Sequence, residues 1–150
     1  MARAVRLSIE NVDSGRGGPF GAVVVKDGGI IGEGANQVTW TKDPTAHAEM
    51  LAIRAACAKL GAFDLPGCDI YTSCEPCPMC LGAIYWARLS RVYFANAAAD
   101  ASSIGFDDSL IYREIPLPLA QRAIPMIQMM REQALAAFQA WQEKPNKIVY

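Results

Sequence analysis

Apolar positions recur in two different periods along this chain, and together they predict a mixed α/β fold. In "ARAVRLSIENV", residues 2–12, Val5, Ile9 and Val12 recur at helical spacing, which predicts a short first helix. In "AVVVKDGGIIGEG", residues 22–34, two apolar runs flank an Asp-Gly-Gly turn, which is typical of a β-hairpin. A glycine-rich loop, residues 13–21, joins this helix to the hairpin.

The rest of the chain continues the alternation of helices and strands. Thr45 is a good N-cap residue, and it is expected to begin a helix that Gly61 ends. Further strands are expected at residues 68–73, 90–95 and 124–130, a short helix or turn at 107–115, and helices at 76–89 and 131–144. This order predicts an α/β fold, a three-layer α/β/α sandwich with a central mixed sheet.

The length and the connections predict one domain with an arm. A chain of 150 residues has the usual size of a single domain, so residues 1–150 are expected to form one. The proline-containing stretch at residues 113–125 is the longest expected connection. Residues 113–150 are therefore expected to form a C-terminal arm.

Composition and charge limit the classes of function that are expected of this chain. The chain has no apolar stretch long enough to span a bilayer and no apparent signal peptide, so we expect a cytoplasmic protein without a membrane partner. Its five cysteines are then expected to stay reduced. The net charge of -1 provides no large basic surface, so nucleic acid is not an expected partner.

The single histidine and a cysteine pair predict a zinc site. Zinc prefers thiolate and imidazole ligands, and His47, Cys77 and Cys80 each lie at the start of an expected helix. Three protein ligands leave the fourth tetrahedral position open for a water molecule whose pKa zinc lowers. Glu49, two residues after His47, is placed to shuttle protons to and from that water.

Each part of this pattern also has a plainer interpretation. A His-x-Glu sequence is common on surface helices, and a Cys-x-x-Cys pair alone fits a redox pair or two buried thiols. Cys74, in "SCEPCPMC", would close a Cys3His site and make it structural rather than catalytic. The combination of His-x-Glu with Pro-Cys-x-x-Cys is far more specific, and it is a known signature of zinc deaminases.

On these motifs, "HAE" and "CEPCPMCLGAI", the sequence resembles the cytidine-deaminase-like superfamily. The resemblance implies that His47, Cys77 and Cys80 bind zinc, that Glu49 is the proton shuttle and that Cys74 is not a ligand. Four stretches also resemble the bacterial guanine deaminases: "GGPFGAVVVKDG", "DPTAHAE", "SCEPCPMCLGAIYWAR" and "GFDDSLIYREI". This second resemblance runs from about residue 4 to Tyr150.

The closer resemblance implies a reaction. Guanine would be hydrolysed to xanthine and ammonia, with zinc-bound hydroxide attacking C2 while Glu49 protonates N3 and assists loss of the amine. Glu75 would be a second catalytic carboxylate that orients or relays protons, although an acid at a helix start is also favourable on its own. The altered polar pattern of the tail, "WQEKPNKIVY", leads us to expect a guanine-like amino-triazine as a second substrate.

The same resemblance implies a purine pocket. An Asn pairs with a base edge, an Asp accepts from guanine N–H groups and aromatic rings stack on a base. The plainer alternatives are a turn residue at Asn36, a helix cap at Asp108, a frayed end at Tyr150 and a solvated charge at Glu143. The implied substrate-binding residues are Asn36, Asp108, Tyr150, Phe20, Ala48 and Glu143.

The resemblance further implies a homodimer in which the C-terminal segment crosses to the other subunit. Two other functions stay open at this point. A tRNA adenosine deaminase would share the zinc motifs but would need a basic groove for RNA. A zinc-stapled structural or binding module would use Cys74 as a fourth ligand and would not need Glu49.

Overall fold

The computed structural model describes residues 1–149 and divides the chain into two compact units, Met1–Asp108 and Ser109–Tyr150. Each unit is described by itself. The first holds the sheet, and the second holds short helical segments and one longer helix. None of the helices in residues 1–149 is long and apolar enough to cross a membrane.

The first unit is built on a four-stranded mixed sheet. Its strands are β1 (Gly21–Lys26), β2 (Gly29–Ala35), β3 (Asp69–Cys74) and β4 (Arg91–Asn96), in the order β2-β1-β3-β4. β1 pairs antiparallel with both of its neighbours, whereas β3 and β4 are parallel. The predicted hairpin and the predicted mixed sheet are both confirmed.

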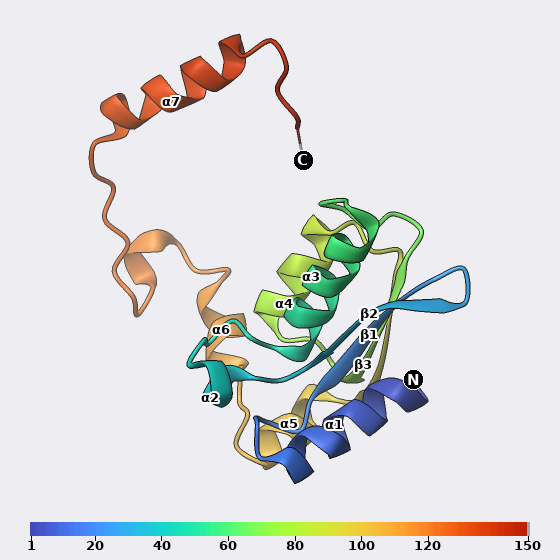
Figure 1. Cartoon of the computed structure of the whole chain (residues 1–150). Coiled ribbons are helices and arrows are strands. Elements are labelled where there is room, and N and C mark those ends of the chain that lie inside the picture. The colour runs from blue at the N-terminus through green and yellow to red at the C-terminus, as the bar shows by residue number, and fades with distance from the viewer. Residues whose placement is uncertain (150) are drawn as a thin grey trace. The chain divides into compact units, whose positions relative to one another are not determined.

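Helices cover the two faces of this sheet (Figure 1). On one face Ala22, Val24 and Ile70 form the core with α3 (Ala48–Leu60) and α4 (Pro78–Trp86). On the other face lies α1 (Ala2–Ser14), because a side chain added to Gly21, which points opposite to Ala22, would meet Ala4 and Ser8 of that helix. The first unit therefore has the three layers that the sequence predicts.

Two short helices were not expected from the sequence. α2 (Val38–Thr41) interrupts the polar loop after β2, and α5 (Ala98–Ser103) follows β4. Helices of one or two turns show no readable apolar period, so the hydrophobic pattern gives no signal for them.

The second unit contains α6 (Ser109–Glu114), a 3-10 turn (Leu119–Gln121) and α7 (Arg131–Glu143). The Arg122 guanidinium donates to the backbone oxygens of Ile115 and Leu117, which ties the turn to the end of α6. The predicted helix at 131–144 is confirmed, and the short helix at 107–115 is found from Ser109. The predicted strand at 124–130 is wrong: an apolar run becomes a strand only when it pairs with another, and the described residues offer it no partner.

The contact between β2 and α3 depends on two glycines. A side chain at Gly32 would collide with Ala52 and Ala56, and one at Gly34 would collide with the backbone oxygen of Ala48. The helix backbone therefore lies directly on the strand. This close contact fixes the start of α3, where the sequence places its candidate chemistry.

We expect Gly34→Ala to lower the free energy of unfolding by ~1–3 kcal/mol, because the added methyl must push α3 off the sheet. Gly29→Ala is the matched control, since its new methyl would meet only Lys26 O at an ordinary 3.6 Å. Urea unfolding of both variants measures the difference. Equal stability of the two would show that α3 does not rest on this glycine.

Candidate functional site

The candidate metal ligands come from the starts of α3 and α4, which lie side by side on one face of the sheet (Figure 1). His47 is the N-cap of α3 and Cys77 the N-cap of α4, and both have extended backbone. Neither side chain caps its own helix. Both are therefore available to face each other across the gap between the helices.

The predicted N-cap at Thr45 is wrong, and α3 begins at Ala48. The Thr45 hydroxyl instead donates to Asp43 Oδ1 at 2.7 Å, and the His47 N–H donates to Thr45 O at 2.8 Å. These local bonds keep residues 43–47 in a turn and delay the helix by two residues. Because α3 begins later than predicted, His47 lies at the N-terminus of the helix, with its imidazole ring outside it.

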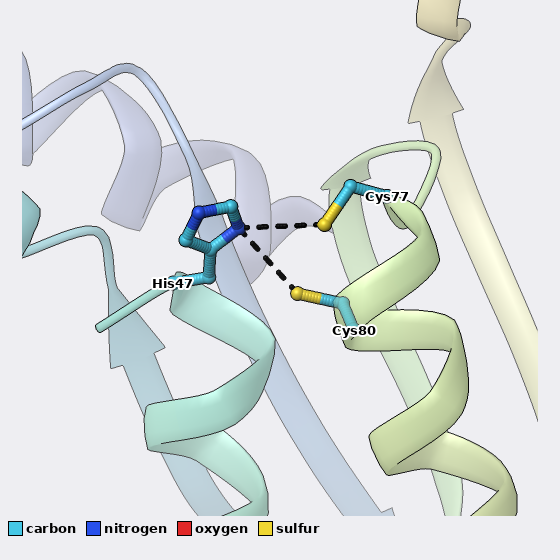
Figure 2. Close-up of side chains that lie close together, drawn as sticks. All are labelled: His47, Cys77 and Cys80. Atoms are coloured by element: carbon cyan, nitrogen blue, oxygen red, sulfur yellow. Dashed lines mark hydrogen bonds between the residues drawn. The ribbon is translucent and has the colours of Figure 1, made fainter. Parts of the chain in front are cut away.

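Three potential ligand atoms converge at this point (Figure 2). His47 Nδ1 lies 3.6 Å from Cys77 Sγ and 3.5 Å from Cys80 Sγ, and all three atoms lie within 4.8 Å of one another. Tetrahedral zinc, with bonds of ~2.0–2.1 Å to nitrogen and ~2.3 Å to sulfur, requires a nitrogen–sulfur separation of about 3.6 Å. The two nitrogen–sulfur separations therefore match those that a tetrahedral zinc ion requires.

Cys74 does not belong to this group. Its side chain is buried, and its Sγ donates weakly to Ala97 O at 3.7 Å, toward the start of α5. The group that could hold a metal is therefore one imidazole and two thiols, and a tetrahedral ion held by them would keep one position open. An open position is what distinguishes a catalytic zinc site from a structural one.

Glu49 is buried next to these ligands. Only 7% of its surface is exposed, and its Oε2 accepts a hydrogen bond from Cys80 Sγ at 3.4 Å. Burial raises the pKa of this carboxyl group above its ordinary value. A carboxyl group with a raised pKa beside an open metal position can both take and return a proton.

The surroundings of Cys77 favour its thiolate form. The hydrogen bond from Cys80 is the main cause, and it lowers the pKa of Cys77 to about 4, with a further contribution from His47. The start of α4 adds a favourable dipole. The thiolate is the form that binds zinc, so Cys77 is prepared for the metal, whereas its hydrogen bond to Cys77 and its burial raise the pKa of Cys80.

Asn36 is a buried residue that follows β2, close to the turn that carries His47. Its Oδ1 accepts from the N–H groups of Gly18 and Val38, each at 3.2 Å, and the next residue, Gln37, donates to Ala46 O. The two donors fix the side chain and identify which terminal atom is the oxygen. Ala48, another candidate, is fully buried under Gly34.

Asp108 and Phe20 lie on two segments that contact each other through an aromatic pair. The pKa of Asp108 is raised, first by burial and then by the negative charge of Cys77, which places this carboxylate within electrostatic reach of the ligands. Phe20 packs edge-to-face on Phe106, with ring centroids 4.9 Å apart. Phe106 belongs to the same "GFDDS" segment as Asp108, so this aromatic pair joins that segment to the glycine-rich loop.

Three candidates remain: Glu75, Glu143 and Tyr150. Glu75 is exposed, and its Oε2 accepts from the Ala98 N–H at 3.0 Å, so this carboxylate binds the first turn of α5. Glu143 is an exposed residue at the end of α7, in the second unit. Tyr150 lies outside the described residues.

One residue of the site region was missed by the sequence analysis. Asn11 is a buried asparagine on α1 whose Nδ2 donates to the backbone oxygens of Gly18 and Asn36, both at 2.8 Å. The available signal was its position: Ala4, Ser8 and Asn11 form the buried side of α1, so a polar side chain stands where an apolar one is expected.

Comparison with known proteins supports the same kind of site. The profile of the cytidine and deoxycytidylate deaminase zinc-binding region matches residues 1–96. The guanine deaminase of Bacillus subtilis is 57% identical over all of this chain and 96% of its own length. The crystal structure of guanine deaminase from that organism has a TM-score of 0.96 and 58% identity, covering 99% of this chain and 95% of the other.

A tRNA-specific adenosine deaminase of Aquifex aeolicus is 49% identical, but only over 51% of this chain and 51% of its own. The likeness to this tRNA enzyme therefore leaves about half of the chain unmatched, whereas the likeness to the guanine deaminase extends over the whole chain. On these matches, the chain belongs to the zinc-binding cytidine and deoxycytidylate deaminase family, in the branch of the bacterial guanine deaminases.

Proposed function

We propose that this chain hydrolyses guanine to xanthine and ammonia. The observation that carries the proposal is the buried Glu49 carboxyl group beside a three-ligand site that leaves one metal position open. A zinc-stapled structural module has no use for such a carboxyl group. The likeness to guanine deaminase over the full chain supports the choice of substrate.

Zinc held by His47, Cys77 and Cys80 supplies a Lewis acid that makes water a nucleophile at neutral pH. Glu49 accepts a proton from the water that adds to C2 of guanine. It returns this proton to the ring at N3, and it then carries a second proton from the added oxygen to the amine. The C2–N bond breaks, ammonia leaves and a carbonyl group remains at C2. Burial of Glu49 suits it to both transfers.

The substrate is oriented by side chains of the glycine-rich loop, the end of β2 and the "GFDDS" segment. The Nδ2 of Asn36 donates to an acceptor of the purine, and Asp108 accepts from its ring N–H groups. Phe20 and Ala48 form apolar contacts with the ring. Glu75 acts on protons through water or orients the leaving group from its place beside α5.

The proposal is tested by ultraviolet spectra of the zinc-loaded protein mixed with guanine, which change as xanthine forms. We expect conversion of guanine, no conversion of adenosine in a tRNA anticodon stem–loop, and slower conversion of a diamino-hydroxy-triazine. Deamination of the RNA without deamination of guanine would assign the chain to the tRNA branch. No conversion of any ring by a folded, zinc-loaded protein would contradict a deaminase.

We also propose that the protein is a cytoplasmic homodimer and that residues 113–150 form an arm exchanged between the subunits of this single-domain protein. The apolar α4 supports an interface: it carries no charged residue, and yet its Leu81 and Tyr85 side chains are exposed, the latter by 76%. The exchanged arm would bring Tyr150 and Glu143 to the partner's purine pocket. The reducing cytoplasm would keep the ligand thiols available for zinc.

Mixing two inactive variants tests the exchange. Glu49→Gln disables the site of its own subunit, and Tyr150→Ala disables the site that receives its tail. After unfolding and refolding together, half of the dimers are mixed and each has one intact site, so about one quarter of the wild-type activity is expected to return. Mixing without unfolding is the control. No recovery in refolded dimers would mean that each tail serves its own subunit.

A further inference from the structure

Asn11, on α1, bonds to two segments of the proposed purine pocket: the glycine-rich loop and the end of β2. Its side chain is 5% exposed, and its amide nitrogen has two hydrogens. One is donated to the Gly18 carbonyl in the glycine-rich loop and the other to the Asn36 carbonyl at the end of β2, both at 2.8 Å. These partners are 7 and 25 residues away in the sequence.

The two partners of Asn11 are also bonded to each other. Gly18 donates its N–H to Asn36 Oδ1, while its carbonyl accepts from Asn11. The three residues therefore form a closed ring of hydrogen bonds that sets both the backbone and the side chain of Asn36. The loop lies so close that a side chain at Gly17 would collide with Asn36 O and Oδ1.

Within this ring of hydrogen bonds, the Asn36 side-chain nitrogen, Nδ2, can still donate to a ligand. Its Oδ1 is used by Gly18 and Val38, whereas its Nδ2 has no hydrogen-bond partner within residues 1–149. Since none of the buried side-chain nitrogen or oxygen atoms described lacks a partner, this Nδ2 must be accessible to solvent. An accessible donor on a side chain that is otherwise locked is ready to meet an acceptor of the substrate.

We infer that Asn11 is a positioning residue for substrate recognition, which presents Asn36 Nδ2 to the purine and holds the loop that carries Phe20. The inference rests on the proposed function through the role of Asn36. Without the two Asn11 bonds, the Asn36 and Gly18 carbonyls would lose their buried donor, and the loop and the Asn36 side chain would take several orientations. Binding would then include the cost of ordering them.

The kinetic test compares Asn11→Ala with Ser8→Ala. Ser8 is a matched control because it is also a buried polar residue of α1, but its hydroxyl bonds only to Val5 O of its own helix. We expect Asn11→Ala to raise KM for guanine about three- to tenfold, the effect of one hydrogen bond, with kcat within about twofold of wild type. Asn11→Ser, which keeps one donor, is expected to be intermediate, and Ser8→Ala unchanged.

A double substitution separates positioning from general loosening. Once Asn36→Ala has removed the presented amide, Asn11→Ala is expected to raise KM by no more than about twofold further. If the two substitutions loosened the structure independently, their separate increases in KM would multiply in the double variant. An unchanged KM in Asn11→Ala, with wild-type enzyme active and Asn36→Ala impaired, would overturn the inference.

A second measurement does not depend on turnover. The side-chain NH2 signals of Asn36, assigned by their loss in Asn36→Ala, are followed by nitrogen-15 NMR in the zinc-loaded protein. We expect them to shift and broaden in Asn11→Ala and Asn11→Ser but not in Ser8→Ala. Unchanged signals would overturn the inference, whatever the substrate. If the signals respond but guanine is not converted, it is the proposed function that fails.

Discussion

Replacing Glu49 with Gln is expected to lower kcat for guanine by ~10²–10⁴-fold, the range of effects attributed to general acid–base catalysis. Gln has the shape of Glu and can still bond to Cys80, but it cannot accept the proton of the attacking water. Zinc content and thermal unfolding should stay close to those of wild type. Conversion of guanine and metal analysis of the same sample measure both properties.

Glu10→Gln is the control for this substitution. Glu10 is an exposed residue of α1 that forms a surface salt bridge with Arg3, so its loss is expected to leave kcat unchanged. A Glu49→Gln protein that keeps more than about a tenth of wild-type kcat would remove Glu49 from the proton-transfer steps, since even the low end of the acid–base range exceeds tenfold.

The second large effect concerns the metal. Cys77→Ser replaces a thiolate that the surrounding hydrogen bonds stabilise, and it leaves only two of the three ligands in place. We expect zinc affinity to fall by more than the ~10–100-fold that loss of a second-shell partner causes, with loss of activity. Because metal binding stabilises only the folded state, the unfolding temperature in excess zinc should also fall. Competition with a chelator and thermal unfolding measure the two effects.

Cys74→Ser is the matched control because the same chemical change is made three residues earlier. Its sulfur contacts Ala97 O and not the ligand group, so stoichiometric zinc and activity should remain. Loss of zinc from Cys74→Ser, at the level of Cys77→Ser, would instead mean a closed four-ligand site. In that case the catalytic interpretation of the centre would fail with it.

Much of the fold follows from the sequence because its elements are long enough to show a period. The helix ending at Gly61 and the hairpin at Asp27–Gly29 have local signals, a left-handed cap and a tight turn, and both are found. The strand expected at 124–130 failed for a non-local reason. Its apolar residues satisfy the pattern, but a strand also requires a partner that the pattern cannot supply.

Some residues of the candidate site could also be predicted from the sequence, and others could not. His47, Cys77 and Cys80 could be placed together because zinc restricts ligand type and spacing. The role of Asn11 could not be read, because its partners are backbone carbonyls, which every residue carries. The exact start of α3 was also missed, since the Asp43–Thr45 bond competes with the helix.

The two glycines beneath α3 restrict how an enzyme of this construction diverges. Because no atom separates Gly32 and Gly34 from the helix backbone, any enlargement there displaces His47 and Glu49 together. The chemistry is thus tied to a part of the sheet that tolerates almost no change. Variation in substrate choice must arise in the loop at residues 15–20, the turn at 36–46 and the segments after β4. A library built to change the accepted ring should randomise those segments and leave the strand beneath α3 untouched.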